Sequence, residues 1–222
     1  MKKRKNIITV AIDSPAAAGA GTQSKYIAEQ YNLMYLDTGK IYRLIGLLRI
    51  KDIKNFNYKL VKNKINNLKI KDLNDKELLS NKVAVSASII ARDMKIRKIV
   101  KKFQLECAYN PPKEFSGSVL DGRDITSVIM KDAMFKFYIT ANIEVRAKRR
   151  FVELRKLKKR ISYKEVLKSL KKRDYLDKKR KFNPLKKTKD SILINTSKLS
   201  KKACFIKIKA IIDEKLKFNG SI

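Results

Sequence analysis

The alternation of short apolar runs with longer amphipathic segments is the feature that most constrains how this chain folds. Five runs have the length and composition of buried strands: Ile7–Ile12, Met34–Leu36, Ser118–Leu120, Phe135–Ile139 and Ile192–Ile194. The segments between them have helical periodicity, and we expect helices at about 22–31, 40–49, 95–109, 142–158, 162–173 and 200–216. Ser162 and Glu165 form a capping box at the start of one of these helices. The alternation predicts an α/β fold with a mainly parallel, five-stranded sheet flanked by helices.

Polar residues gather directly after each predicted strand. The clusters are 13–22, 37–39, 121–124, 140–142 and 195–196. In open α/β sheets, ligands bind at the carboxyl ends of the strands. We therefore expect one edge of the sheet to collect all five clusters and the chemistry of the protein.

The composition limits the kinds of chemistry that are open to the chain. No histidine occurs, which excludes Ser-His-Asp and Cys-His catalysis and histidine-bound metals. The two cysteines, Cys107 and Cys204, match no metal motif and are expected to be reduced and buried. Carboxylates, cations and a hard metal ion remain for catalysis.

The net charge of +34 fits either a polyanionic partner or a lysine-rich surface that faces solvent. Arginine is more informative, because only 13 of the 55 basic residues are arginines and their planar forks bind phosphate in a bidentate manner. The apolar run after the basic N-terminus is six residues long, too short for a signal peptide or a membrane span. We expect a cytoplasmic protein without a membrane partner.

The first predicted strand leads into a loop of small residues and then into a helix. The loop comprises Ser14, Pro15, Ala16, Ala17, Ala18, Gly19, Ala20, Gly21 and Thr22. Small residues let backbone N–H groups turn toward a phosphate, and the helix N-terminus adds a favourable dipole. Compared with the Walker A pattern G-x-x-x-x-G-K-[ST], Ser14 replaces the first glycine and Ala20 replaces the lysine. Alone, the loop fits an ordinary alanine-rich turn as well as a phosphate site.

Motifs further along the chain indicate a family. They are Asp37-Thr38-Gly39-Lys40-Ile41-Tyr42-Arg43, Asp121-Gly122-Arg123-Asp124, Lys131-Asp132-Ala133, residues 146–150, and residues 173–180 followed by Pro184-Leu185. In this order and at similar spacing, they resemble the motifs of bacterial cytidylate kinases. The resemblance covers about 7–215 and fades within about 51–80, and the Walker A loop departs from the family by lacking its lysine.

The resemblance implies a P-loop nucleoside-monophosphate kinase that transfers the γ-phosphoryl group of ATP to CMP or dCMP with Mg²⁺. It implies a single domain over 1–222, with a core at about 6–38 and 95–215, a monophosphate-binding segment at about 39–94 and a basic lid at about 158–185. We expect a monomer whose partners are these nucleotides.

By position, the resemblance also implies roles for single residues. Those that would hold CMP are Thr38, Arg43, Arg97, Arg123, Asp124, Arg173, Asp177 and Arg180. Arg123, Arg173 and Arg180 would also be catalytic, since phosphoryl transfer needs positioning and charge neutralisation. Arg149 and Arg150 fall on the ATP side, together with loop 14–22.

Each candidate carboxylate fits two roles, one at the site and one in the structure. Asp124 and Asp177 would accept hydrogen bonds from the cytosine amine or the sugar hydroxyls, which favours cytosine over uracil. Thr22, Asp13 and Asp121 would face Mg²⁺, mostly through water. Each carboxylate also fits a helix cap or a surface ion pair.

The alanine at position 20 leaves the charge of the Walker lysine unaccounted for. Loss of one such charge-stabilising group lowers a rate by roughly 10²–10³. The enzyme is then slow, or the lid arginines suffice, or another lysine substitutes. We favour Lys40 as a catalytic substitute, because it follows the neighbouring strand; Lys25 is the second candidate, and Lys40 also fits a solvated surface position.

Two other functions compete with this prediction. Another kinase of the same fold, such as an adenylate kinase, fits the segment 19–23. A catalytically weak relic that binds RNA fits the 21 of 55 basic residues that lie within 141–190. The aromatic residues there are too sparse for a base-stacking platform, so we do not expect a nucleic-acid partner.

Overall fold

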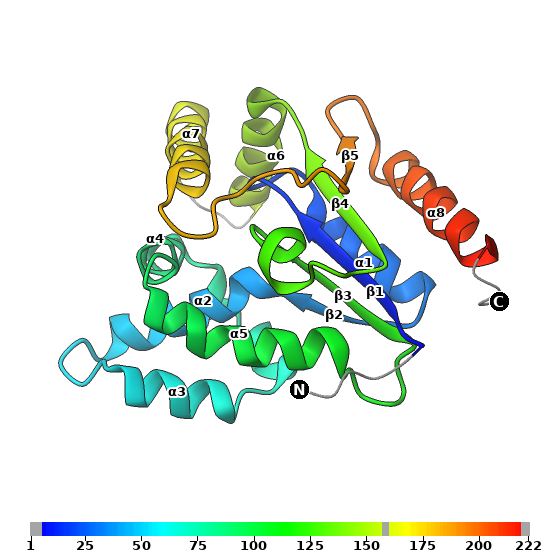
Figure 1. Cartoon of the computed structure of the whole chain (residues 1–222). Helices are drawn as coiled ribbons and strands as arrows, with labels where there is room; N and C mark the ends of the chain where they lie inside the picture. Colours follow the sequence, from blue (N-terminus) through cyan, green and yellow to red (C-terminus); the bar gives the residue numbers. More distant parts are fainter. Residues whose placement is uncertain (1–5, 157–159, 219–222) are drawn as a thin grey trace.

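The computed structural model describes residues 6–156 and 160–218 and contains a central sheet between two layers of helices (Figure 1). The strands are β1 (Ile8–Asp13), β2 (Leu33–Asp37), β3 (Gly117–Gly122), β4 (Phe135–Thr140) and β5 (Ile192–Asn195). The helices are α1 (Ala20–Gln30), α2 (Thr38–Lys51), α3 (Tyr58–Asn66), α4 (Asn81–Ile90), α5 (Met94–Tyr109), α6 (Ile143–Lys156), α7 (Tyr163–Lys179) and α8 (Lys201–Phe218). The basic residues 1–5 and the predicted helix end at Lys158 lie outside the described residues.

The five strands form one sheet in the order β2-β3-β1-β4-β5, and every neighbouring pair is parallel. All five strands lie where the apolar runs predict them, so the predicted α/β fold is confirmed. The sheet was expected to be mainly parallel, and its described pairings are parallel throughout. Among the described residues, no helix is long and apolar enough to cross a membrane.

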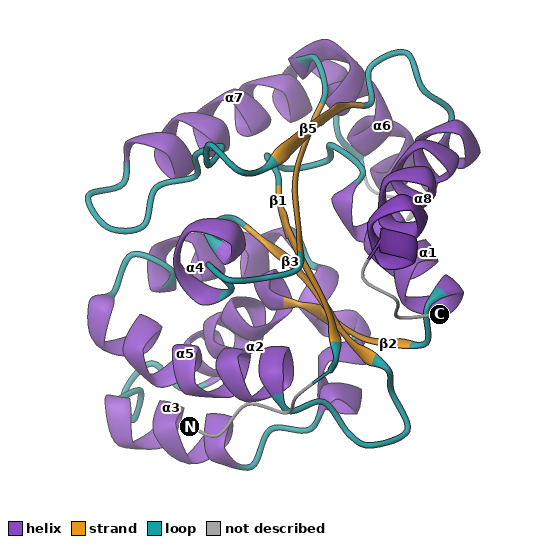
Figure 2. Ribbon diagram, turned by 45° about the vertical axis from the view of Figure 1, so that its right-hand side comes forward, coloured by secondary structure: helices purple, strands orange, loops and turns teal. Residues whose placement is uncertain are grey.

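Side chains that alternate along each strand bury themselves against different helices. Val10 and Ile12 of β1 pack with residues of α1 and α8, whereas Ala11 between them packs with residues of α2, α4 and α5. Figure 2 shows these two helix layers on opposite sides of the twisted sheet. Cys107 and Cys204 are free and buried in the two layers, as expected.

Helix α7 begins where the capping box predicts and ends later than predicted. The Ser162 hydroxyl accepts a hydrogen bond from the Glu165 N–H at 3.2 Å, and the Glu165 carboxylate accepts one from the Ser162 N–H at 2.8 Å. The helix runs to Lys179, beyond the expected end at about Arg173. Its last turns are held by ion pairs of Asp174 and Asp177 to other elements, which apolar periodicity does not report.

The segment 51–90 is the part of the fold that the sequence described least. It contains α3, short 3₁₀ helices at Ile70–Asn74 and Lys76–Leu79, and α4, which was not predicted. Helix α4 packs against α2 at Gly46, where an added Cβ would lie 2.8 Å from the Ala87 backbone nitrogen. The Ser86 hydroxyl donates to the Gly46 carbonyl at 3.0 Å. This close contact brings the C-terminal half of α4 toward the carboxyl ends of the strands.

Candidate active site

A cleft with a volume of about 460 Å³ opens at the carboxyl ends of β1, β2 and β3. It is lined by loop 14–22 and the clusters after β2 and β3, and by residues of α4, α5, α6 and α7. Because the five strands are parallel, all five clusters lie at the predicted edge of the sheet, but the clusters 140–142 and 195–196 do not line the cleft. They lie behind the loop, where the Thr196 hydroxyl donates to the Ala18 carbonyl at 2.9 Å.

The loop has the backbone of an anion cradle. Ala17 and Gly19 have positive φ angles of 61° and 98°. The Ala16 carbonyl accepts from Arg146 Nη1 at 3.1 Å, which holds that carbonyl behind the loop. Helix α1 begins at Ala20 without a side-chain cap, so the positive end of its dipole is free for an anionic ligand.

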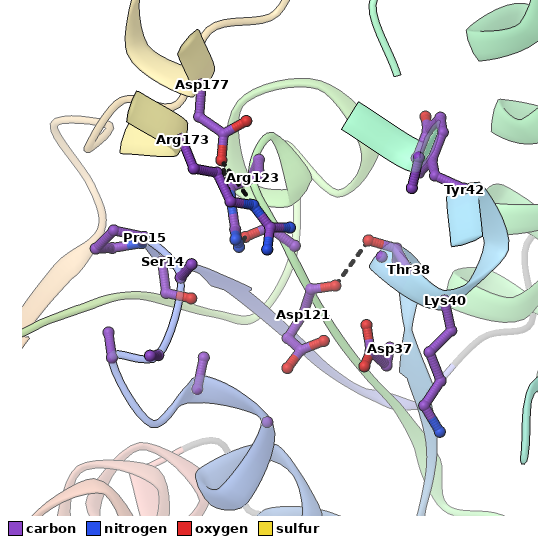
Figure 3. Close-up of a pocket in the computed structure, with 18 of the residues that line it drawn as sticks. Ser14, Pro15, Asp37, Thr38, Lys40, Tyr42, Asp121, Arg123, Arg173 and Asp177 are labelled. Atoms are coloured by element: carbon purple, nitrogen blue, oxygen red, sulfur yellow. Dashed lines mark hydrogen bonds and ion pairs between the residues drawn. The ribbon is translucent and has the colours of Figure 1, made fainter. Parts of the chain in front are cut away.

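The side chains of the loop add no cation to this cradle. Ala20 is buried, at 6% exposure, where the Walker lysine was expected. Lys25 and Lys40 both line the cleft. In Figure 3, Lys40 lies across Asp37 and Asp121 from loop residue Ser14, and its side chain extends away from Arg123 and Arg173.

Two carboxylates lie on the floor of the cleft beside the loop. Burial and the neighbouring charge of Asp37 raise the pKa of Asp121 well above its ordinary value. The Tyr35 hydroxyl donates to Asp121 Oδ2 at 3.3 Å, and an added Cβ at Gly21 would lie 3.4 Å from the same oxygen. Together with the Thr22 hydroxyl, this oxygen-rich corner suits a hard cation that keeps most of its waters.

Asp13 does not share that corner, which corrects its expected role at the metal. It is fully buried, at 0% exposure, and does not line the cleft. Its carboxylate accepts hydrogen bonds from the Ile125 N–H at 2.7 Å, the Thr126 N–H at 2.9 Å and the Thr126 hydroxyl at 2.6 Å. Burial raises the pKa of Asp13 to about 6 despite these three donors.

The cleft also contains a set of paired charges, which we call the arginine wall. Its members are Arg97, Arg123, Asp124, Arg173, Asp177 and Arg180. Arg123 Nε donates to Asp177 Oδ2 at 2.7 Å, and Arg173 Nε lies 4.0 Å from the same oxygen. Asp124 binds Arg97 and also lies 3.4 Å from Arg180 Nη2. Thr38, whose hydroxyl donates to the Asp121 carbonyl at 2.7 Å, and Arg43, which donates to the Leu78 carbonyl at 2.7 Å, complete the predicted CMP-binding set in the cleft.

The arginine wall has hydrogen-bond donors that are free to bind an anion. Burial, and then the nearby guanidinium of Arg123, lower the pKa of Arg173 to about 10. Its Nε is buried without a hydrogen-bond partner among the described residues. A donor that is shielded from water and lacks an acceptor is costly unless a ligand supplies one, and a phosphate group supplies several acceptors.

The two arginines expected on the ATP side differ in position. Arg150 lines the cleft and forms an ion pair with Glu153 at 2.7 Å. Arg149 does not line it, which corrects the expectation of direct contact. Its guanidinium donates to the hydroxyl and the carbonyl of Thr196, at 2.8 and 2.7 Å, and thus supports the loop from behind.

Several residues of the cleft were missed from the sequence. Tyr42 belongs to the motif 37–43, but the sequence predicted no role for it. Its ring centroid lies 5.6 Å from the guanidinium of Arg97. Ala87, Ser88 and Ala91 reach the cleft from α4 and the residue after it. They were missed because α4 was not predicted, although Ser80 was an available signal: its hydroxyl accepts from the Val83 N–H at 3.3 Å and caps the start of α4.

Comparison with known proteins agrees with these features. The sequence model of the family described as "Cytidylate kinase" matches residues 10–214. A "Cytidylate kinase" of Clostridium botulinum (strain Loch Maree / Type A3) is 39% identical and is aligned over 92% of this chain and 97% of its own length. A "Cytidylate kinase" of Bartonella tribocorum is 40% identical, over 95% of this chain and 96% of its own.

A solved structure supports the fold independently of these names. The crystal structure of an uncharacterized protein from Eubacterium ventriosum has a TM-score of 0.55 and 18% identity, and covers 93% of this chain and 98% of that one. At this identity the likeness shows the fold alone. The family match and the two relatives together confirm the resemblance seen in the motifs, and this chain belongs to the cytidylate kinase family, whose members are nucleoside-monophosphate kinases.

Proposed function

We propose that this chain transfers the γ-phosphoryl group of ATP to a phosphate oxygen of CMP or dCMP, giving ADP and CDP or dCDP in the cytoplasm. The bond between the β,γ-bridging oxygen and the γ-phosphorus breaks, and a bond from that phosphorus to the acceptor oxygen forms. The observation that carries the proposal is the arginine wall in the same cleft as the phosphate loop. Such a reaction needs two phosphate sites in one water-poor space.

The acceptor nucleotide would lie along the arginine wall. Arg123 and Arg173 would bind the acceptor phosphate, and Arg180 would neutralise charge on the transferred group. Thr38, Arg43, Arg97 and Asp177 would hold the rest of the nucleotide. Asp124 is buried, so a cytosine amine that donates to it would be favoured, and the carbonyl of uracil would face an acceptor.

The donor nucleotide would lie on loop 14–22, with its phosphates at the N-terminus of α1 and Arg150 beside them. Thr22 and Asp121 would hold Mg²⁺ mostly through water. This ion would neutralise charge on the phosphate oxygens. Lys40, which lines the cleft, would turn its side chain from its place beyond Asp37 and Asp121 toward the loop and supply the ammonium that Ala20 lacks.

Two segments would move around these nucleotides. The monophosphate-binding segment at about 39–94 contributes Arg43 and α4, and the lid at about 158–185 contributes α7 with Arg173 and Asp177. The lid carries residues of the arginine wall, and the monophosphate-binding segment carries residues near the wall. Nucleotide binding would therefore draw the two segments together. Both belong to one domain of a protein that we propose to be a monomer.

The experiment is a substrate panel. The purified chain is given ATP and Mg²⁺ with CMP, dCMP, UMP or AMP, and formation of the diphosphate is followed. The proposal expects CMP and dCMP to be the best acceptors and UMP to be poor. Preference for AMP would replace it with an adenylate kinase. No turnover with any acceptor, together with strongly salt-dependent RNA binding, would favour the RNA-binding alternative.

A further inference from the structure

A buried carboxylate joins the phosphate loop to the arginine wall. Asp13 is the last residue of β1, and the loop begins at the next residue. It lies outside the cleft and touches none of the space that nucleotides would occupy. The proposed reaction therefore does not explain why the carboxylate of Asp13 is buried in the interior. Burying a charged group costs free energy unless hydrogen bonds or charges compensate it.

The partners of Asp13 all belong to one turn. The Ile125 N–H, the Thr126 N–H and the Thr126 hydroxyl donate to its carboxylate at 2.6–2.9 Å. These residues open a π-helical turn, Ile125–Ile129, and both are buried. The amides at the start of such a turn have no partner within it, so a carboxylate there takes the role of a cap from a distant part of the chain.

A second hydrogen bond fixes the other end of the same segment. The Ser14 N–H donates to the Gly122 carbonyl at 3.1 Å. Gly122 itself admits no side chain, since an added Cβ would lie 2.5 Å from the Thr38 hydroxyl oxygen. Two successive residues, the last of β1 and the first of the loop, thus hold the segment 122–126 at both ends.

Arg123 and Asp124 are the residues between these two attachments. Arg123 reaches Asp177, and Asp124 reaches Arg97 and Arg180, so both belong to the arginine wall. We infer that Asp13, acting through Thr126, is a positioning residue that fixes the arginine wall relative to the phosphate loop. This inference rests on the proposed function only for the identity of the acceptor nucleotide.

The side chain of Thr126 allows a mild test with a matched control. Thr126→Val keeps the shape and the N–H of residue 126 but removes the hydroxyl that Asp13 binds, whereas Thr126→Ser keeps the hydroxyl. Loss of a hydrogen bond to a charged group is expected to raise the KM for CMP about fivefold to tenfold in Thr126→Val. The KM for ATP should stay within about twofold of the wild type, and Thr126→Ser should resemble the wild type.

Asp13→Asn is the stronger variant. Its amide places an N–H₂ group against at least one of the three donors, so kcat/KM for CMP should fall by about 100-fold, with both a raised KM and a lowered kcat. Thermal unfolding and the exchange rates of the Ile125 and Thr126 amides are measured on every variant. Faster exchange at these two amides is expected in Asp13→Asn.

The outcomes separate positioning from stability. If the KM values for CMP and ATP rise together, or if only thermal stability changes, Asp13 is a structural residue and the inference is wrong. If the wild type does not phosphorylate CMP, the proposed function fails, and the variants are compared by calorimetric binding of whichever monophosphate of the panel the wild type takes. If Thr126→Val or Asp13→Asn binds that monophosphate with the wild-type Kd, the inference is wrong. If the wild type binds none of the four monophosphates, both the inference and the proposed function are wrong.

Discussion

The phosphate loop and the arginine wall present charge to the cleft in different ways. Loop 14–22 contains no cationic side chain and offers backbone and the N-terminus of α1. The arginine wall offers guanidinium groups, each beside a buried or half-buried carboxylate. A site made by backbone survives changes of side chain as long as its conformation persists, whereas a site made by side chains does not. We therefore expect the largest effects of substitution in the wall, although the departure from the Walker pattern is in the loop.

Arg123→Ala should have the largest effect on catalysis. It removes a fork from the acceptor phosphate and leaves the half-buried carboxylate of Asp177 without its 2.7 Å partner. We expect kcat/KM for CMP to fall by about 10³ in steady-state kinetics. Arg123→Lys should recover only part of this loss, because an ammonium cannot bind both groups as a fork.

The control for that prediction is Arg150→Ala. Arg150 also lines the cleft, but its partner Glu153 is half-exposed, so no buried charge is left behind. A fall of kcat/KM as large as that of Arg123→Ala would show that the arginine wall and the ATP side contribute alike, and that the wall is no more sensitive to substitution.

Asp124→Asn should have the next largest effect, on the choice of base. The ratio of kcat/KM for CMP to that for UMP is expected to fall by about 10², because the amide of asparagine can donate to uracil where the carboxylate only accepts. Glu153→Gln, a change of the same kind at a cleft residue outside the wall, should leave the ratio unchanged. A ratio that survives Asp124→Asn would move base selection to another part of the cleft.

The contribution of Lys40 should be smaller, since the arginines share the charge of the transferred group. Lys40→Ala is expected to lower kcat by about tenfold, with Lys25→Ala as the matched control. In an Ala20→Lys background, Lys40→Ala should have little effect, because the loop then carries its own ammonium. If kcat is unchanged in Lys40→Ala and unchanged again in Lys25→Ala, the cleft works without a substitute for the missing lysine.

How much the sequence reveals differs between these regions for a physical reason. The wall is built from side chains in motifs that resemble those of cytidylate kinases, so the resemblance named its residues in advance, and all of them line the cleft. The loop works through φ angles, such as 61° at Ala17, and alanine gives no sign of a left-handed conformation. The weak match of the loop to its pattern thus understates how well its backbone suits an anion.

The errors in the site also have a common origin. Asp13 is at the end of a strand and Arg149 is in the motif 146–150, as expected. Both side chains nevertheless bind neighbouring backbone groups and do not face the cleft. Sequence position gives the location of a Cα atom relative to a strand end, and the direction of the side chain depends on tertiary partners. Helix α4 was missed although Ser80 caps its start, because the position of the helix depends on its tertiary contact with α2 at Gly46.

The last prediction concerns stability rather than activity, at the junction between the two regions, where Asp13 lies. Its pKa is about 6 in the folded chain and 3.8 when exposed, so between these values the folded state holds a proton that the unfolded state has lost. Stability contributed by this group therefore falls as the pH rises from about 4 to about 6 and is constant above that. Asp13→Asn lacks the titration, so the free energy of unfolding of the wild type minus that of the variant should fall over this window by up to about 3 kcal/mol. Urea denaturation at several pH values measures the difference, in which the other titrating groups cancel. A difference that rises with pH would mean that the three donors outweigh burial, and that the turn beneath the arginine wall binds the carboxylate more tightly than its buried position suggests.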